Sequence, residues 1–532
     1  MGILWFGGQI YTMEKEGSMV EAVFTVDDTI KAAGTYEKLY HTFYDDIDKE
    51  VNLQGRTMIP GLVDSHLHIV MHGEKLLRLD LSQMTSAEEV KEALQNRIPY
   101  LSDGEWLIGE GWNENQWDTP SIINREELDS IAPDNPMMLT RICRHALIAN
   151  TKALEIASID KNTADPQGGR IVRDENGEVT GYLLDNAQDL VKTSLPDVSQ
   201  SYLEQVIKIA VDDLHSKGLV GGHTEDLNYY GYRKTLDAYH SALHKDRKFK
   251  AHLLVHHEVV DELIQDRLRY LDGTRYVEMG AVKIFSDGAL GGRTAWLSED
   301  YSDDPGNKGF AIHETQELEQ IIKKARKHQL PVAVHAIGDK AVEEIAGLIK
   351  KYPLENGARD RIIHGVMLNE STLDLLKELP AVVDIQPSFM TSDFPWVIDR
   401  LGEKRLELSY AWKTMIENNI FCAGGSDAPI EEVDPLVGIE AAVTRKSTIN
   451  DQVYHPEEKL SVYQAVRLYT AGSAYVVNQE DSRGVIVDGY RADFTVLGED
   501  IFQTDAEKIS DIPIEMTVVD GDIVYERNPS RA

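Results

Sequence analysis

Eight short apolar runs, most of them separated by helical patterns, constrain the fold of this 532-residue chain more than any other feature. The runs cover residues 61–67, 219–223, 251–256, 281–285, 331–335, 361–364, 382–386 and 421–425. Between them, segments 316–328 and 340–351 carry the apolar periodicity of amphipathic helices. Strands that alternate with helices in this number are typical of the α/β class, and we predict a (β/α)₈ TIM barrel.

The first apolar run ends in two histidines, His66 and His68, spaced at i and i+2. Side chains alternate sides along a β-strand, so this spacing puts both imidazoles on one face. Two convergent imidazoles can bind a divalent metal ion. The alternative is that one ring faces a core and the other faces water, and the pair alone does not decide between the two.

Other apolar runs also carry residues that can bind a metal or react. Lys283 lies inside one run, where a solvated ammonium group would be unfavourable, and His335 and His364 each end another. Asp427 follows the last run in a Gly- and Pro-rich turn. Each has an ordinary alternative, such as a snorkelling lysine or an aspartate that caps a helix. A parallel barrel, however, gathers its functional residues at the carboxyl ends of its strands.

The segments outside the barrel runs predict two additions. Residues 72–215 separate the first two runs and contain strand-like pieces at 106–109, 137–142 and 181–184, which indicates an insertion domain within the 62–476 barrel. Residues 1–61 and 477–532 contain β-rich stretches and are expected to pair into one small β-sandwich.

Composition and charge exclude several classes of protein. The net charge of −36 argues against binding to nucleic acid or to anionic membranes. The two cysteines, Cys143 and Cys422, cannot make a disulfide framework and suit a reducing compartment. The first residues lack a basic region followed by an apolar core, and no apolar run approaches the roughly 20 residues of a membrane span. We therefore expect a soluble, cytoplasmic protein with a small-molecule substrate, and a homodimer is compatible with the sequence.

The order His-x-His, Lys, His, His, Asp resembles that of the metal-dependent amidohydrolase superfamily. Further stretches resemble its YtcJ-like group (amidohydrolase family 3), which includes N-substituted formamide deformylases. They are residues 109–112, 283–288, 291–295, 335–339, 386–388, 425–429, 469–474 and 489–497. The similarity runs along nearly the whole chain and supports both the insertion domain and the sandwich. One departure is Ile363, which stands where relatives usually have Glu.

The resemblance implies a binuclear centre, with zinc as the leading metal. One ion would be held by His66, His68 and Asp427, and the other by His335 and His364. Burial lowers the pKa of a lysine, and a neutral amine can react with CO₂, so Lys283 is expected to form a carbamate that bridges the ions. Asp427 would take a proton from the attacking water and pass it to the leaving amine. A single metal beside a purely structural Lys283 is the alternative.

The expected reaction is hydrolysis of a carbon–nitrogen bond in a non-peptide amide, such as an N-substituted formamide. The same centre could hydrolyse a lactone, an ester or a phosphoester, and a non-catalytic regulatory barrel is a further alternative, although such proteins usually lose ligands. Trp112, Asp287 and Arg293 are candidate substrate-binding residues; core packing, a turn and a surface ion pair are their ordinary alternatives. His256 and His257 also end a run, and only one of the two can face the pocket.

Overall fold

The computed structural model describes residues 1–102, 104–114, 117, 121–141, 145–355 and 357–528. The chain forms two compact units, one from Met1–His72 with Gln200–Ala532 and one from Gly73–Ser199. Among the described residues, no helix is both long enough and apolar enough to cross a lipid bilayer.

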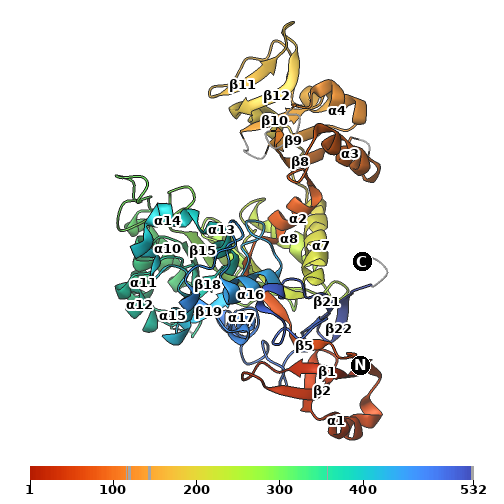
Figure 1. Ribbon diagram of the computed structural model, residues 1–532, viewed down its shortest axis with the longest axis vertical. Helices are drawn as coiled ribbons and strands as arrows, with labels where there is room; N and C mark the ends of the chain where they lie inside the picture. Colours follow the sequence, from red (N-terminus) through yellow and green to blue (C-terminus); the bar gives the residue numbers. More distant parts are fainter. Residues whose placement is uncertain (103, 115–116, 118–120, 142–144, 356, 529–532) are drawn as a thin grey trace. The chain divides into compact units, whose positions relative to one another are not determined.

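Eight parallel strands of the first unit form the predicted barrel (Figure 1). They are β6 (Leu62–Leu67), β13 (Leu219–Thr224), β14 (Lys250–His256), β15 (Val277–Phe285), β16 (Val332–Ala336), β17 (Asp360–His364), β18 (Ala381–Ile385) and β19 (Phe421–Gly424). The sheet is nearly closed, because the N–H of Asp427, just after β19, donates to the carbonyl oxygen of His66 on β6 over 2.7 Å. The α/β class and the barrel are thus confirmed.

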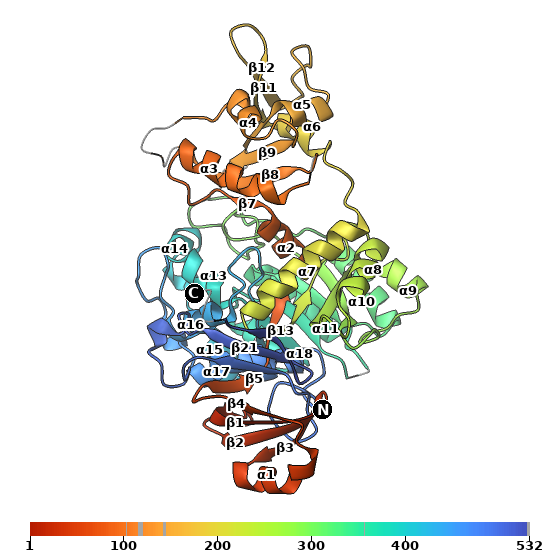
Figure 2. The ribbon, with the colours of Figure 1, turned by 90° about the vertical axis from the view of Figure 1, so that its right-hand side faces the viewer.

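Helices cover the outer face of these strands, as Figure 2 shows. The α-helices from residue 200 onward are α7 (Gln200–Ser216), α8 (Tyr232–Ala242), α9 (Val260–Gln265), α10 (Thr315–Lys327), α11 (Asp339–Lys351), α12 (Glu370–Lys377), α13 (Pro387–Asp393), α14 (Trp396–Leu401), α15 (Trp412–Glu417), α16 (Pro435–Thr444), α17 (Val462–Arg467) and α18 (Ser473–Val476). Inside the barrel, Leu254, Ala281, Ala333 and Ile363 form one apolar layer. Ile363 therefore packs in the core at the position where relatives usually have Glu.

Strands from both ends of the chain share one hydrogen-bonded sheet in the first unit, which also holds helix α1 (Tyr36–Phe43). The strands are β1 (Gly2–Tyr11), β2 (Met19–Val26), β3 (Thr29–Gly34), β4 (Lys49–Asn52), β5 (Thr57–Pro60), β20 (Phe494–Leu497), β21 (Ile514–Val519) and β22 (Asp522–Glu526). In Figure 1 the red and blue strands lie side by side, since β5 pairs antiparallel with β20. Trp5 and Phe494, 5.7 Å apart between ring centroids, share the apolar core of this sheet.

The second unit is a mixed sheet with short helices, entered through α2 (Ile69–Leu77). Its elements are β7 (Leu79–Asp80), α3 (Ala87–Arg97), β8 (Leu107–Trp112), α4 (Arg125–Ile131), β9 (Met137–Arg141), β10 (Ala146–Ala149), α5 (Thr151–Ile156), β11 (Gly169–Arg173), β12 (Val179–Asp185) and α6 (Asp189–Lys192). The unit ends at Ser199, before the predicted boundary at 215, because α7 packs with α8 of the first unit. Ile142 and Cys143 lie outside the described residues.

Candidate metal centre

Strand β6 positions the two histidines of the His-x-His pair. His66 and His68 are 1% and 8% exposed, and their ring centroids are 5.4 Å apart. The carboxylate of Asp64 accepts hydrogen bonds from the N–H of His66 over 2.9 Å and from the hydroxyl of Ser426 over 2.6 Å. Asp64 therefore ties the strand that carries the histidines to the loop that carries Asp427.

The ring orientation of His68 is set by groups that follow β13. Its Nδ1 lies 2.9 Å from the carbonyl oxygen of Glu225, so Nδ1–H donates there and Nε2 points to Asp427, to which it donates when the ring is protonated. That Nε2 lies 3.1 Å from Oδ1 of Asp427. The hydroxyl of Tyr229 donates to the Glu225 carboxylate over 2.7 Å and lies 3.2 Å from Nδ1 of His68. Neither Glu225 nor Tyr229 belongs to the predicted site.

Lys283 lies at the centre of the predicted ligand set. Its side chain is fully buried on β15, with Nζ 3.2 Å from Nε2 of His66 and 4.7 Å from the ring centroid of Phe285. Burial lowers the pKa of Lys283 to about 8. At pH 7 roughly a tenth of such lysines carry a neutral amine, against roughly 0.03% at the ordinary pKa of a lysine. The amine can therefore react with CO₂.

The rings of His335 and His364 point one nitrogen each toward the other, and neither of these two nitrogens carries a proton. Nε2 of His335 lies 3.1 Å from the carbonyl oxygen of Gly288, and Nδ1 of His364 lies 2.7 Å from Oε1 of Gln386. Both acceptors take an N–H, so in the neutral rings Nδ1 of His335 and Nε2 of His364 are unprotonated. These two atoms are 3.0 Å apart. Two facing lone pairs are unfavourable unless a cation lies between them.

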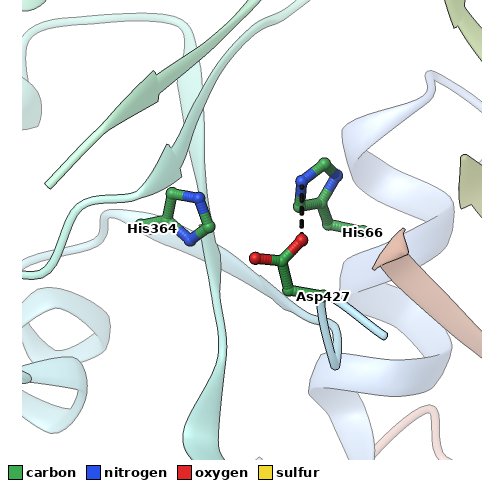
Figure 3. A group of neighbouring side chains, drawn as sticks. All are labelled: His66, His364 and Asp427. Atoms are coloured by element: carbon green, nitrogen blue, oxygen red, sulfur yellow. Dashed lines mark ion pairs between the residues drawn. The ribbon is translucent and has the colours of Figure 1, made fainter. Parts of the chain in front are cut away.

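Asp427 completes the group from the loop after β19. The structure brings its carboxylate, His66 and His364 together with potential ligand atoms within 4.8 Å of one another, all buried. Figure 3 shows the Asp427 carboxylate between the two rings, with Oδ1 3.4 Å from Nε2 of His66. Asp427 and His364 both adopt left-handed backbone conformations, with φ of +58° and +76°. These turns aim the two side chains into the barrel mouth.

The spacing of these atoms fits a divalent metal ion. Two ligands of one zinc ion, with bonds of about 2.0–2.1 Å, lie about 2.9–3.4 Å apart for angles between a right angle and a tetrahedral one. The pairs His335–His364, His68–Asp427 and His66–Asp427 lie at 3.0, 3.1 and 3.4 Å. The six predicted residues thus lie close together, buried except for the partly exposed His335: His66, His68, Lys283, His335, His364 and Asp427.

Comparison with known proteins agrees with this geometry. A model of the amidohydrolase family matches residues 49–525. The chain belongs to the amidohydrolase family. It is 49% identical to the putative amidohydrolase YtcJ of Bacillus subtilis, over 99% of this chain and 100% of that one. It is 24% identical to the N-substituted formamide deformylase of Arthrobacter pascens, over 99% of both chains.

A solved structure supports the same assignment. A metal-dependent hydrolase from Pyrococcus horikoshii superposes with a TM-score of 0.79 and 27% identity, over 95% of this chain and 99% of that one. The resemblance inferred from the ordered motifs of the sequence is therefore confirmed.

A buried ion pair lies beneath the candidate ligands of this amidohydrolase. Nε of Arg361 donates to Oδ2 of Asp384 over 2.7 Å, and Arg361 also donates to the carbonyl oxygen of Ser65, which precedes His66. Both side chains are at most 1% exposed. Arg361 therefore balances a buried charge and fixes the backbone next to a ligand.

Arg361→Leu is expected to lower the free energy of unfolding by about 3–5 kcal/mol, because it leaves the buried Asp384 carboxylate without its partner. Urea denaturation measures this change, and metal analysis measures the accompanying loss at His66. The double variant Arg361→Leu/Asp384→Leu is the matched control and should recover part of the stability. A single variant within 1 kcal/mol of the wild type would contradict this role of the pair.

The three candidate substrate-binding residues have structural partners. Asp287 accepts hydrogen bonds from the N–H groups of Trp296, Ile337 and Gly338, and so joins two loops at the barrel mouth. Arg293 forms a two-pronged ion pair with Asp303. Trp112 is 3% exposed in the core of the second unit, where its Nε1 donates to the carbonyl oxygen of Leu139. Arg293 and Trp112 thus have the contacts of a surface ion pair and of core packing, and Asp287 bridges two loops; a role of the three residues in substrate binding stays a prediction.

Proposed function

We propose that this protein is a metal-dependent hydrolase of carbon–nitrogen bonds in non-peptide amides, with N-substituted formamides as the leading substrate class. The observation that carries the proposal is the pair of unprotonated nitrogens of His335 and His364, 3.0 Å apart beside the buried His66, His364 and Asp427 group. The likeness to proteins named as an amidohydrolase, a formamide deformylase and a metal-dependent hydrolase supports the chemistry.

The residues divide into two sets of donors. His66, His68 and Asp427 would hold one ion, and His335 and His364 a second, with the carbamate of Lys283 between them and zinc as the first candidate. A bound divalent ion polarises a carbonyl group and lowers the pKa of water. Asp427 holds its carboxylate where it can take the proton of the attacking water and deliver it to the leaving nitrogen. The carbonyl oxygen of Glu225 and the side chain of Gln386 keep the neighbouring rings in the required tautomers.

The test combines metal analysis with a hydrolysis screen. Purified protein should carry one to two equivalents of divalent metal and should hydrolyse N-butylformamide or another N-acyl amine faster than a lactone or a phosphoester. His66→Ala should lose metal and activity together, because it removes one donor of the buried group. His240→Ala, which changes an exposed histidine on α8, is the matched control. Full metal loading in His66→Ala would refute the site, and a loaded protein that hydrolyses only lactones or phosphoesters would refute the substrate class.

A further inference from the structure

His256, the last residue of β14, lies beside the metal centre but belongs to neither set of donors. In the pairing of β14 with β15, His256 is the register partner of Lys283. Partners in a parallel pair present their side chains on the same face of the sheet. The imidazole of His256 therefore faces the barrel interior next to the Lys283 side chain.

Ring contacts place His256 at the edge of the same site. Its ring centroid lies 5.8 Å from that of Phe285, and the Phe285 ring lies 5.3 Å from that of His335. Nζ of Lys283 lies 4.7 Å from the same Phe285 ring. The Phe285 ring thus contacts His256 as well as two of the proposed ligand residues, Lys283 and His335. His256 is 7% exposed, so it is not a surface side chain.

The two nitrogens of His256 have different surroundings. Nδ1 accepts a hydrogen bond from the backbone N–H of Glu258 over 3.3 Å, so Nδ1 carries no proton and the ring proton is on Nε2. Among the described residues, Nε2 has no hydrogen-bond partner. Nε2 is not fully buried, so its N–H is accessible and can donate to an acceptor atom of a bound ligand.

We propose that His256 is a further catalytic residue, whose Nε2–H donates a hydrogen bond to the carbonyl oxygen of the substrate. This rests on the proposed hydrolysis. As the water oxygen bonds to the carbonyl carbon, the π electrons of the carbonyl move onto its oxygen, and the hydrogen bond from His256 strengthens. The carbon–nitrogen bond then breaks, and the proton taken by Asp427 goes to the nitrogen. His256 keeps its own proton throughout.

The neighbouring His257 provides a matched control. It follows the end of β14, and its ring packs against the rings of His256 and His313, with centroids 4.5 Å and 4.9 Å away. Its backbone N–H donates to the carbonyl oxygen of Lys283 over 2.9 Å, a contact that a side-chain substitution retains. His257→Gln therefore changes a similar residue at the same strand end without changing the proposed donor.

The kinetic test compares His256→Leu, His256→Gln and His257→Gln. His256→Leu should lower kcat by about 10²–10³-fold with a smaller change in KM, as expected when a donor to a developing oxyanion is lost. His256→Gln keeps an N–H at similar reach and should recover part of kcat. His257→Gln should match the wild type, and all three variants should keep their metal. Unchanged kcat in His256→Leu would overturn the proposal.

A binding test separates this inference from the proposed function. Methylphosphonate mimics a tetrahedral oxyanion, and calorimetry of the metal-loaded proteins measures its affinity without turnover. His256→Leu should bind it at least about tenfold more weakly, which is the effect of one lost hydrogen bond to a charged group. Equal affinity in all variants, or no binding by the wild type, would overturn the role of His256. If no amide is hydrolysed but this difference persists, the substrate class fails and the role of His256 stands.

Discussion

Asp427→Asn is expected to lower kcat by about 10²–10⁴-fold while metal content falls only modestly. Asparagine keeps the size and one oxygen donor but cannot accept a proton. Burial favours the neutral acid, but the hydrogen bond from His68 and the nearby charges outweigh it, so the pKa of Asp427 is lowered and the carboxylate is ionised near neutral pH. Steady-state kinetics and metal analysis of the same samples measure the two effects.

The control for this substitution is Asp451→Asn, at a side chain that is 87% exposed, and it should behave as the wild type. In the wild type, the acidic limb of the pH–rate profile should report the coupled titration of Asp427 and the loaded centre. Near-normal turnover in Asp427→Asn would show that another group moves the proton.

Lys283→Ala is expected to lower the rate by about 10²-fold or more, because the centre loses an anionic oxygen donor worth several kcal/mol of transition-state stabilisation. Short carboxylic acids such as acetate should restore part of the activity by occupying the space of the lost side chain. Protein prepared with ¹³C-labelled bicarbonate should give a carbamate signal by NMR, and Lys283→Ala should lack that signal.

Lys350→Ala, at an exposed lysine on α11, is the matched control and should change neither the rate nor the signal. A metal-loaded crystal in which Lys283 carries a plain amine that contacts no metal would disprove the carbamate. It would favour a single metal beside a structural lysine.

The barrel strands are predictable from the sequence because parallel strands are buried on both faces and so appear as nearly continuous apolar runs. Seven of the eight begin within one residue of the predicted start, and β15 begins four residues earlier. The end of the second unit is not predictable in this way. The pattern of α7 shows that one face is buried, but it does not show whether that face packs on the barrel or on the insertion.

The residues around the ligands are harder to predict than the ligands themselves. His66, Lys283 and Asp427 interrupt or end apolar runs, which is a local signal. Glu225 contacts His68 through a backbone carbonyl oxygen, and Tyr229 contacts both Glu225 and His68 from the loop after β13, so neither contact depends on a recognisable sequence pattern. Asp64 is the exception, since an aspartate within a buried strand is a signal that pattern reading could have used.

The left-handed backbone conformations of His364 and Asp427 lower the stability of the fold while they place two side chains that the proposed activity needs. Residues other than glycine destabilise a folded chain by about 1–2 kcal/mol when held in the left-handed region, and both of these ligands are held there. Glycine at either position would relieve that strain but would remove a donor of the proposed metal centre. A homologue that no longer needs catalytic activity would therefore become more stable if glycine replaced His364 or Asp427. Under the proposed function, the side chains of His364 and Asp427 are therefore kept at a cost to the stability of the fold.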